Sequence, residues 1–183
     1  MKELLLYLAG PVTGTSFGHS SSWRDSVIDR LPPNITGLSP LRIETYLKQE
    51  TVLSDSYPEY ALSTEKAINR RAIFEVERCD AILVNFLGAK KVSIGTVMEM
   101  AWGKDKPIFI AMEPDNIHRH AMINDTAMCI VPTLEEALDM AIKVLTPFAV
   151  RRHCNACVRF NEELKAQCPY VYDCDTGNRR YER

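Results

Sequence analysis

The sequence contains no long hydrophobic run and no excess of one charge. Its longest apolar runs, residues 4–9 and 107–112, are far too short to span a bilayer. Lysine and arginine total 22, aspartate and glutamate total 24, and the formal net charge is −2. This balance gives no strong field toward nucleic acids or anionic membranes. We therefore expect neither a membrane nor a nucleic-acid polymer as partner.

The first residues also lack the features of a secretory signal. Met1-Lys2-Glu3 leads into a strand-like run without a small-residue cleavage site. We therefore expect a cytoplasmic protein whose six cysteines stay reduced or bind metal. With 183 residues, of which 46% are hydrophobic and 25% charged, the chain suits one globular domain with or without an appendage.

Five short apolar runs alternate with segments of helical period. The expected strands cover residues 4–9, 35–41, 81–86, 107–112 and 127–131. The expected helices cover residues 23–31, 64–78, 96–103 and 132–145. This alternation predicts an α/β fold, with a doubly wound five-stranded parallel sheet of the flavodoxin or Rossmann-like kind. Residues 43–63 show no clear period and are expected to form a lid or a crossing loop.

The composition changes near Phe148. Residues 149–183 are polar and contain four of the six cysteines. We therefore expect an α/β domain at 1–148 and a Cys-rich C-terminal extension at 149–183. Four thiolates that include one C-x2-C pair suit a structural, tetrahedral zinc ion, and reduced thiols or disulfides are the alternatives. The candidate zinc ligands are Cys154, Cys157, Cys168 and Cys174.

A single carboxylate, Glu99, lies in the apolar stretch SIGTVMEMAWG at residues 93–103. One interpretation is structural, because Thr96 and Glu99 have the spacing of a capping box. The other is chemical, because a carboxylate in the first turn of a helix is favoured in its ionised form. Gly95 would let a ligand approach the backbone there closely. The two interpretations are compatible.

Two loops rich in small hydroxyl residues, 13–22 and 88–96, bear on the chemical interpretation. They follow the strands expected to flank the point where strand order reverses, which is where doubly wound sheets bind ligands. Glu99 is therefore expected to project into a polar crevice. A carboxylate there can attack the anomeric carbon of a sugar and form a covalent glycosyl-enzyme.

Three blocks of sequence resemble the nucleoside 2-deoxyribosyltransferase family, which includes the 2'-deoxynucleoside 5'-phosphate N-hydrolases. The blocks are LLYLAGPVTG at 5–14, CDAILVNF at 79–86 and SIGTVMEMAWGKDKPI at 93–108. The resemblance implies that Glu99 is the nucleophile, that Tyr7 orients it, and that catalysis uses no cofactor. Judged from the sequence around it alone, Tyr7 fits a core aromatic residue better.

The resemblance also implies substrate contacts. Ser93 stands where the N-hydrolases have a serine and the transferases an aspartate, and a hydroxyl with nearby amides can bind a phosphate. A serine that makes a turn is the alternative. Gly10, Thr13, Gly95 and Thr96 are the further candidates for substrate binding.

The chain departs from the family pattern in two places. Ala72 follows Arg71 where the family has an acid that faces the nucleobase, so base recognition or leaving-group protonation must differ. The first loop has no arginine before Arg24, where the hydrolases carry one. From one chain, the crevice is therefore expected to be short of cationic or donor groups. The residues that could replace the missing contacts are His19, Thr13, Thr15 and Ser16.

His120 lies in the segment HAMIN at 120–124. This segment resembles one that a subunit lends to its neighbour's site, which predicts a homodimer or higher homo-oligomer. An exposed loop histidine is the alternative for His120.

Three functions fit the sequence. The first is N-glycosidic cleavage of a 2'-deoxynucleoside or its 5'-monophosphate. The second is deoxyribosyl transfer to another base, and the third is nucleotide binding without catalysis, with Glu99 acting as a helix cap.

Overall fold

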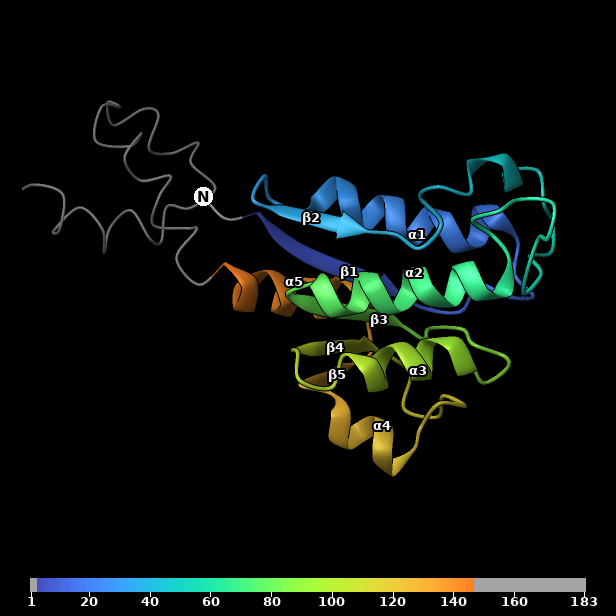
Figure 1. The fold of residues 1–183 in the computed structure, drawn as a ribbon. Helices are drawn as coiled ribbons and strands as arrows, with labels where there is room; N and C mark the ends of the chain where they lie inside the picture. Colours follow the sequence, from blue (N-terminus) through green and yellow to red (C-terminus); the bar gives the residue numbers. More distant parts are fainter. Residues whose placement is uncertain (1–2, 147–183) are drawn as a thin grey trace, which may run out of the picture. The chain divides into compact units, whose positions relative to one another are not determined.

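The computed structural model describes residues 3–146, in which five parallel strands form one sheet (Figure 1). The strand order is β2-β1-β3-β4-β5. The strands are β1 (Leu4–Ala9), β2 (Ile35–Leu38), β3 (Ala81–Asn85), β4 (Ile108–Ala111) and β5 (Cys129–Val131). Because the chain passes from β1 outward to β2 and then back to β3, the order reverses between β1 and β3. The predicted five-stranded parallel α/β sheet is confirmed.

Helices cover both faces of this sheet. They are α1 (Phe17–Arg30), η1 (Thr45–Leu47, a 3-10 helix), α2 (Glu65–Arg78), α3 (Ile94–Trp102), α4 (Ala121–Thr126) and α5 (Leu134–Leu145). One core cluster joins the sheet to α2, α3 and α4, and the other joins it to α1 and α5. Alternate residues of β1 enter the two clusters: Tyr7 belongs to the first, and Leu6 and Leu8 to the second. Burial on both faces explains the unbroken apolar sequence of β1.

Helices α1 and α4 differ most from the sequence predictions. The first begins at Phe17, six residues before the expected start at Trp23, because the Ser16 side chain accepts a hydrogen bond from the His19 amide at 3.1 Å and caps it. Short helix α4 was not predicted, and His120 caps it through its own ring nitrogen. Much of the loop expected after β1 is therefore helical.

The segment between β2 and α2, expected to be a lid or a crossing loop, is joined to the loop after β1. Leu53 donates its amide hydrogen to the Thr15 carbonyl at 2.7 Å and accepts one from Gly14 at 2.8 Å. A small core of Phe17, Leu41, Leu47 and Leu53 lies beneath it. These contacts hold the segment beside the carboxyl end of β1.

Residues 3–145 belong to one compact unit, which ends at Leu145. The predicted domain boundary at 148 and the extension 149–183, with Cys154, Cys157, Cys168 and Cys174, lie outside them. Within residues 3–146, no group of three or more His, Cys, Asp or Glu side chains could hold a metal ion. Over the same range, every helix is too short or too polar to cross a membrane.

Candidate active site

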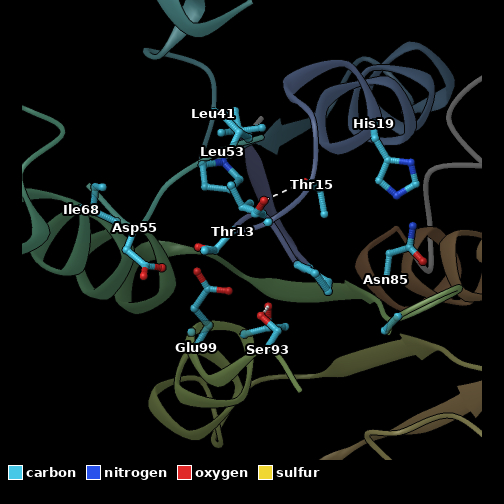
Figure 2. A pocket seen from close by; sticks show the side chains of 18 of the residues that line it. Thr13, Thr15, His19, Leu41, Leu53, Asp55, Ile68, Asn85, Ser93 and Glu99 are labelled. Carbon is cyan, nitrogen blue, oxygen red and sulfur yellow. Dashed lines mark hydrogen bonds between the residues drawn. The ribbon is translucent and has the colours of Figure 1, made fainter. Parts of the chain in front are cut away.

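A cavity of about 1140 Å³ opens at the carboxyl ends of β1 and β3 (Figure 2). Its walls come from the loops after these two strands, the first turns of α3, the inner side of α2 and the segment between β2 and α2. Its volume exceeds that of most sites for small organic ligands, about 300–1,000 Å³. The position is the one that the reversal of strand order predicts.

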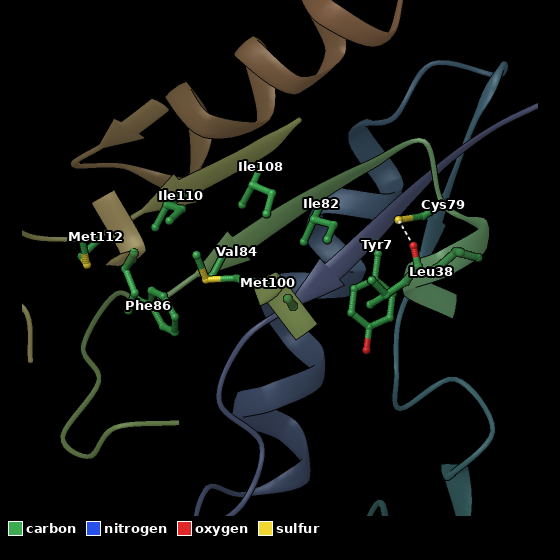
Figure 3. Close-up of a cluster of buried hydrophobic side chains, with 13 residues drawn as sticks. Tyr7, Leu38, Cys79, Ile82, Val84, Phe86, Met100, Ile108, Ile110 and Met112 are labelled. Atoms are coloured by element: carbon green, nitrogen blue, oxygen red, sulfur yellow. Dashed lines mark hydrogen bonds between the residues drawn. The ribbon is translucent and has the colours of Figure 1, made fainter. Parts of the chain in front are cut away.

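Tyr7 and Glu99 form the central contact of this cavity. The Tyr7 hydroxyl donates a hydrogen bond of 2.7 Å to Oε1 of Glu99, which joins β1 to α3. The ring of Tyr7 is fully buried in the first core cluster, and its hydroxyl points out of that cluster (Figure 3). Tyr7 is therefore both a core aromatic residue and the partner of Glu99.

The capping box expected at Thr96 is not formed. Ser93 is the N-cap residue of α3, so Thr96 lies inside the first turn, buried, with its hydroxyl 2.9 Å from that of Ser93. Glu99 consequently lies in the second turn and bonds to Tyr7 instead of returning to a helix amide. A residue far along the chain stabilises this earlier start of α3. The Ser93 amide donates a hydrogen bond of 2.8 Å to Nε2 of buried His118.

Burial raises the pKa of Glu99 from its ordinary value of 4.5 to about 7. The hydrogen bond from Tyr7 and the positive charge of Arg24 lower the pKa only in part. Burial and the neighbouring Glu99 raise the pKa of Tyr7 well above its usual value, so the phenol keeps the proton that it donates. The sequence-based expectation that the helix dipole keeps Glu99 ionised is wrong, because desolvation is the larger effect.

This shift predicts a pH-dependent cost to stability. Between pH 4.5 and 7 the unfolded chain has lost the Glu99 proton while the folded chain still holds it, so stability falls as pH rises. Glu99→Gln keeps an acceptor for Tyr7 and removes this ionisation. In urea titrations, the variant should exceed the wild type by on the order of 3 kcal/mol at pH 8 and match it near pH 4.5. A difference that is the same at both pH values would contradict the assignment.

Arg24 is a buried cation that the sequence interpretation missed. Its Nε donates to the Leu8 carbonyl and one terminal nitrogen to the Gly10 carbonyl, both at 3.0 Å, and the other terminal nitrogen bonds to the Ser20 carbonyl. Its guanidinium carbon lies 4.3 Å from the centre of the Trp23 ring. Burial lowers its pKa only to about 10, so the charge persists at neutral pH. The available signal was an arginine directly beside the apolar positions of its helix.

All but one of the predicted catalytic and substrate-binding residues line the same cavity. These are Tyr7, Gly10, Thr13, Ser93, Gly95, Thr96 and Glu99. For Gly10 the structure also shows a packing reason, because a Cβ there would lie 2.9 Å from the Asn85 carbonyl oxygen. His120 lies elsewhere: it is exposed at the start of α4, where its Nδ1 accepts from the Met122 amide at 3.3 Å. Its contact with a neighbouring subunit stays a prediction.

The cavity contains more cations than the sequence suggested. Lys90 and Lys91 line it from the loop after β3, and the Lys91 ammonium lies 3.3 Å from the position of a Cβ on Gly14. Arg42 and Arg71 line it as well, and they form ion pairs with Glu75 and Glu44. The expectation of a crevice short of positive groups is therefore wrong, because it considered only the first loop and Ala72.

The sequence matches no family model and no curated protein. A 2-deoxyribosyltransferase from the psychrotolerant bacterium Bacillus psychrosaccharolyticus has a similar structure, with a TM-score of 0.53 and 17% identity. The match covers 73% of this chain and 90% of that chain. A conserved protein from Enterococcus faecalis V583 matches with a TM-score of 0.43 and 15% identity over 75% of this chain and 87% of its own.

The described residues thus have the fold of a 2-deoxyribosyltransferase, and the resemblance noted in the sequence extends to the fold. The site joins a carboxyl group of raised pKa, the phenol that donates to it and a cationic rim of Lys90 and Lys91 in one cavity. Such a group can act as a nucleophile once ionised, and its orientation is already set.

Proposed function

We propose that this protein cleaves the N-glycosidic bond of a 2'-deoxynucleoside or its 5'-monophosphate through Glu99. The hydrogen bond of 2.7 Å between Tyr7 and Glu99, at the wall of a large cavity, carries this proposal. One carboxylate oxygen is held by the phenol, and the other can attack C1' of the sugar. The base then leaves, and water attacks the glycosyl-Glu99 ester to release the sugar and restore the carboxylate.

The cationic rim favours the 5'-monophosphate over the nucleoside. Lys90 and Lys91 line the cavity, Lys91 beside Gly14 of the loop that follows β1, and the hydroxyl of Ser93 lies at the start of α3. Positive charge and hydroxyl donors suit a phosphate dianion. The Ser93 amide, in contrast, is occupied by His118. We therefore assign any phosphate contact of Ser93 to its side chain.

Deoxyribosyl transfer to a second base is the alternative, and it differs only in what attacks the glycosyl-enzyme. The cavity volume of about 1140 Å³ leaves room for an acceptor. Binding without catalysis is less well supported, since the structure gives Glu99 no capping contact that would explain it.

One experiment separates these functions. A panel of 2'-deoxynucleosides and their 5'-monophosphates is incubated with the protein, with and without a free acceptor base, and the products are separated by chromatography. Hydrolysis predicts free base in both conditions, together with the free sugar from a nucleoside or the sugar phosphate from a 5'-monophosphate. Transfer predicts a new nucleoside or nucleotide only with the acceptor. Binding to the protein without any turnover would contradict both enzymatic proposals.

We also propose that the protein is a homodimer or higher homo-oligomer. On α3, Ile94 and Met98 are one turn apart and exposed, and Met122 is exposed on neighbouring α4. Apolar side chains on adjoining helices suit a self-complementary contact. Sedimentation at micromolar concentration measures this, and a strictly monomeric protein with full activity would contradict it. A cytoplasmic location stays a prediction.

A further inference from the structure

Four carboxyl groups line the cavity, and three of them already have partners. Glu99 bonds to Tyr7. Glu44 accepts from Arg71 at 2.5 Å, and Glu75 forms ion pairs with Arg42 and Arg78. The fourth group, Asp55, forms no hydrogen bond or ion pair with any other residue of the described range. Its carboxylate is exposed to the cavity and free to meet a ligand.

The backbone places Asp55 close to the site. Leu53, two residues earlier, is buried and bonded to Gly14 and Thr15 of the loop after β1. The Ser54 amide donates to the Tyr57 hydroxyl at 3.0 Å, which ties the next turn of the chain together. Figure 2 shows the Asp55 and Glu99 carboxyl groups pointing into the same part of the cavity.

A cleavage that forms a covalent glycosyl-carboxylate ester uses a second carboxyl group. The leaving group departs with the electron pair of the broken bond and needs a proton, and the attacking water must later lose one. Most other ionisable groups that line the cavity already have partners. Glu44 and Glu75 hold arginines, the Tyr7 phenol holds Glu99, and Ala72 offers no polar atom. His19 lies on the far side of the cavity, near Asn85 (Figure 2).

We propose that Asp55 is the acid and base of the reaction, an inference that rests on the proposed function. As C1'–N breaks and the Glu99 oxygen bonds to C1', the Asp55 carboxyl group gives a proton to the departing base nitrogen. The resulting Asp55 carboxylate then takes a proton from a water molecule while the oxygen of that water attacks C1'. The C1'–O bond to Glu99 breaks, Glu99 regains its charge, and Asp55 is protonated again. Water and nucleotide have become base and sugar phosphate.

This role predicts a dependence on the leaving group. Asp55→Asn should lower kcat/KM for a purine 2'-deoxynucleoside 5'-monophosphate by about 10²–10⁴-fold, the usual range for general acid catalysis. The same variant should lose less than about tenfold on the N7-methylated analogue, whose base leaves neutral without added protonation. For pyrimidines, a 5-nitro group that acidifies the base serves the same purpose. Glu59→Gln, an exposed acid on the same segment but outside the cavity lining, is the matched control.

The kinetics of the variants on the two substrates distinguish the possible roles. Selective loss on the unmodified nucleotide supports the assignment. Equal losses on both substrates, or no loss on either, overturn it while the proposed function stands, because the wild type still turns over. If Glu99→Ala retains turnover, the nucleophile assignment fails. If the wild type cleaves neither substrate, the proposed function fails, and the role of Asp55 fails with it.

Discussion

Replacing Glu99 by alanine is expected to lower kcat for glycosidic cleavage by about 10⁴-fold or more while the fold survives. The carboxylate forms a bond in the proposed mechanism, and removal of a covalent nucleophile has effects of this size. Its loss costs the fold only one hydrogen bond to Tyr7, on the order of 1 kcal/mol, and it removes a poorly solvated carboxylate. Tyr7→Phe should lose less, about 10–100-fold, because the nucleophile remains.

The measurement is kcat on the best substrate of the panel, with circular dichroism as the control for folding. A folded Glu99→Ala protein with near-normal turnover would contradict the role of Glu99. If Tyr7→Phe lost as much activity as Glu99→Ala, Tyr7 would do more than orient the carboxylate. The two variants together thus separate bond formation from orientation.

Replacing Arg24 by leucine is expected to lower the free energy of unfolding by about 3–5 kcal/mol. The variant leaves the carbonyls of Leu8, Gly10 and Ser20 buried without this donor. Loss of a buried charge that is held by several hydrogen bonds has effects of this size. The change also removes the nearby positive charge that lowers the pKa of Glu99.

Urea denaturation measures this loss, and Arg30→Leu is the matched control. Arg30 is on the same helix, but it is partly exposed and pairs with exposed Glu135 at 3.3 Å. Its loss should cost less than about 1 kcal/mol. Similar costs for the two variants would show that Arg24 does not support the carboxyl end of β1.

Local patterns in the sequence predicted the sheet because each strand is a short apolar run between polar or turn residues. Strand β1 was predicted with its observed bounds, since Leu4–Ala9 is apolar throughout and Gly10-Pro11 ends it. The position of the cavity followed from strand order, because parallel strands expose their carboxyl ends on one edge. The bounds of β1 depend on one short segment of sequence, and the position of the cavity depends on the order of the strands.

The details of the site depend on contacts between distant segments. The start of α3 was misplaced because buried His118, 25 residues away, fixes the Ser93 amide. The pKa of Glu99 was misjudged because desolvation depends on the packing of the whole cavity wall. Asp55 was not singled out, since nothing near it in the sequence shows that Leu53 bonds to the loop after β1. A local pattern gives no access to such contacts.

The covalent state of Glu99 during turnover tests the central claim most directly. The protein is mixed with a 2'-fluoro-2'-deoxynucleotide, whose fluorine slows breakdown of the intermediate by disfavouring positive charge at C1'. After an acid quench and proteolysis, mass spectrometry measures the peptide that contains Glu99. We predict that this peptide gains one glycosyl phosphate group, with fragmentation placing it on Glu99, and that Glu99→Ala shows no gain. Turnover of the analogue with the group on another residue, or with no covalent group at any time point, would contradict the account.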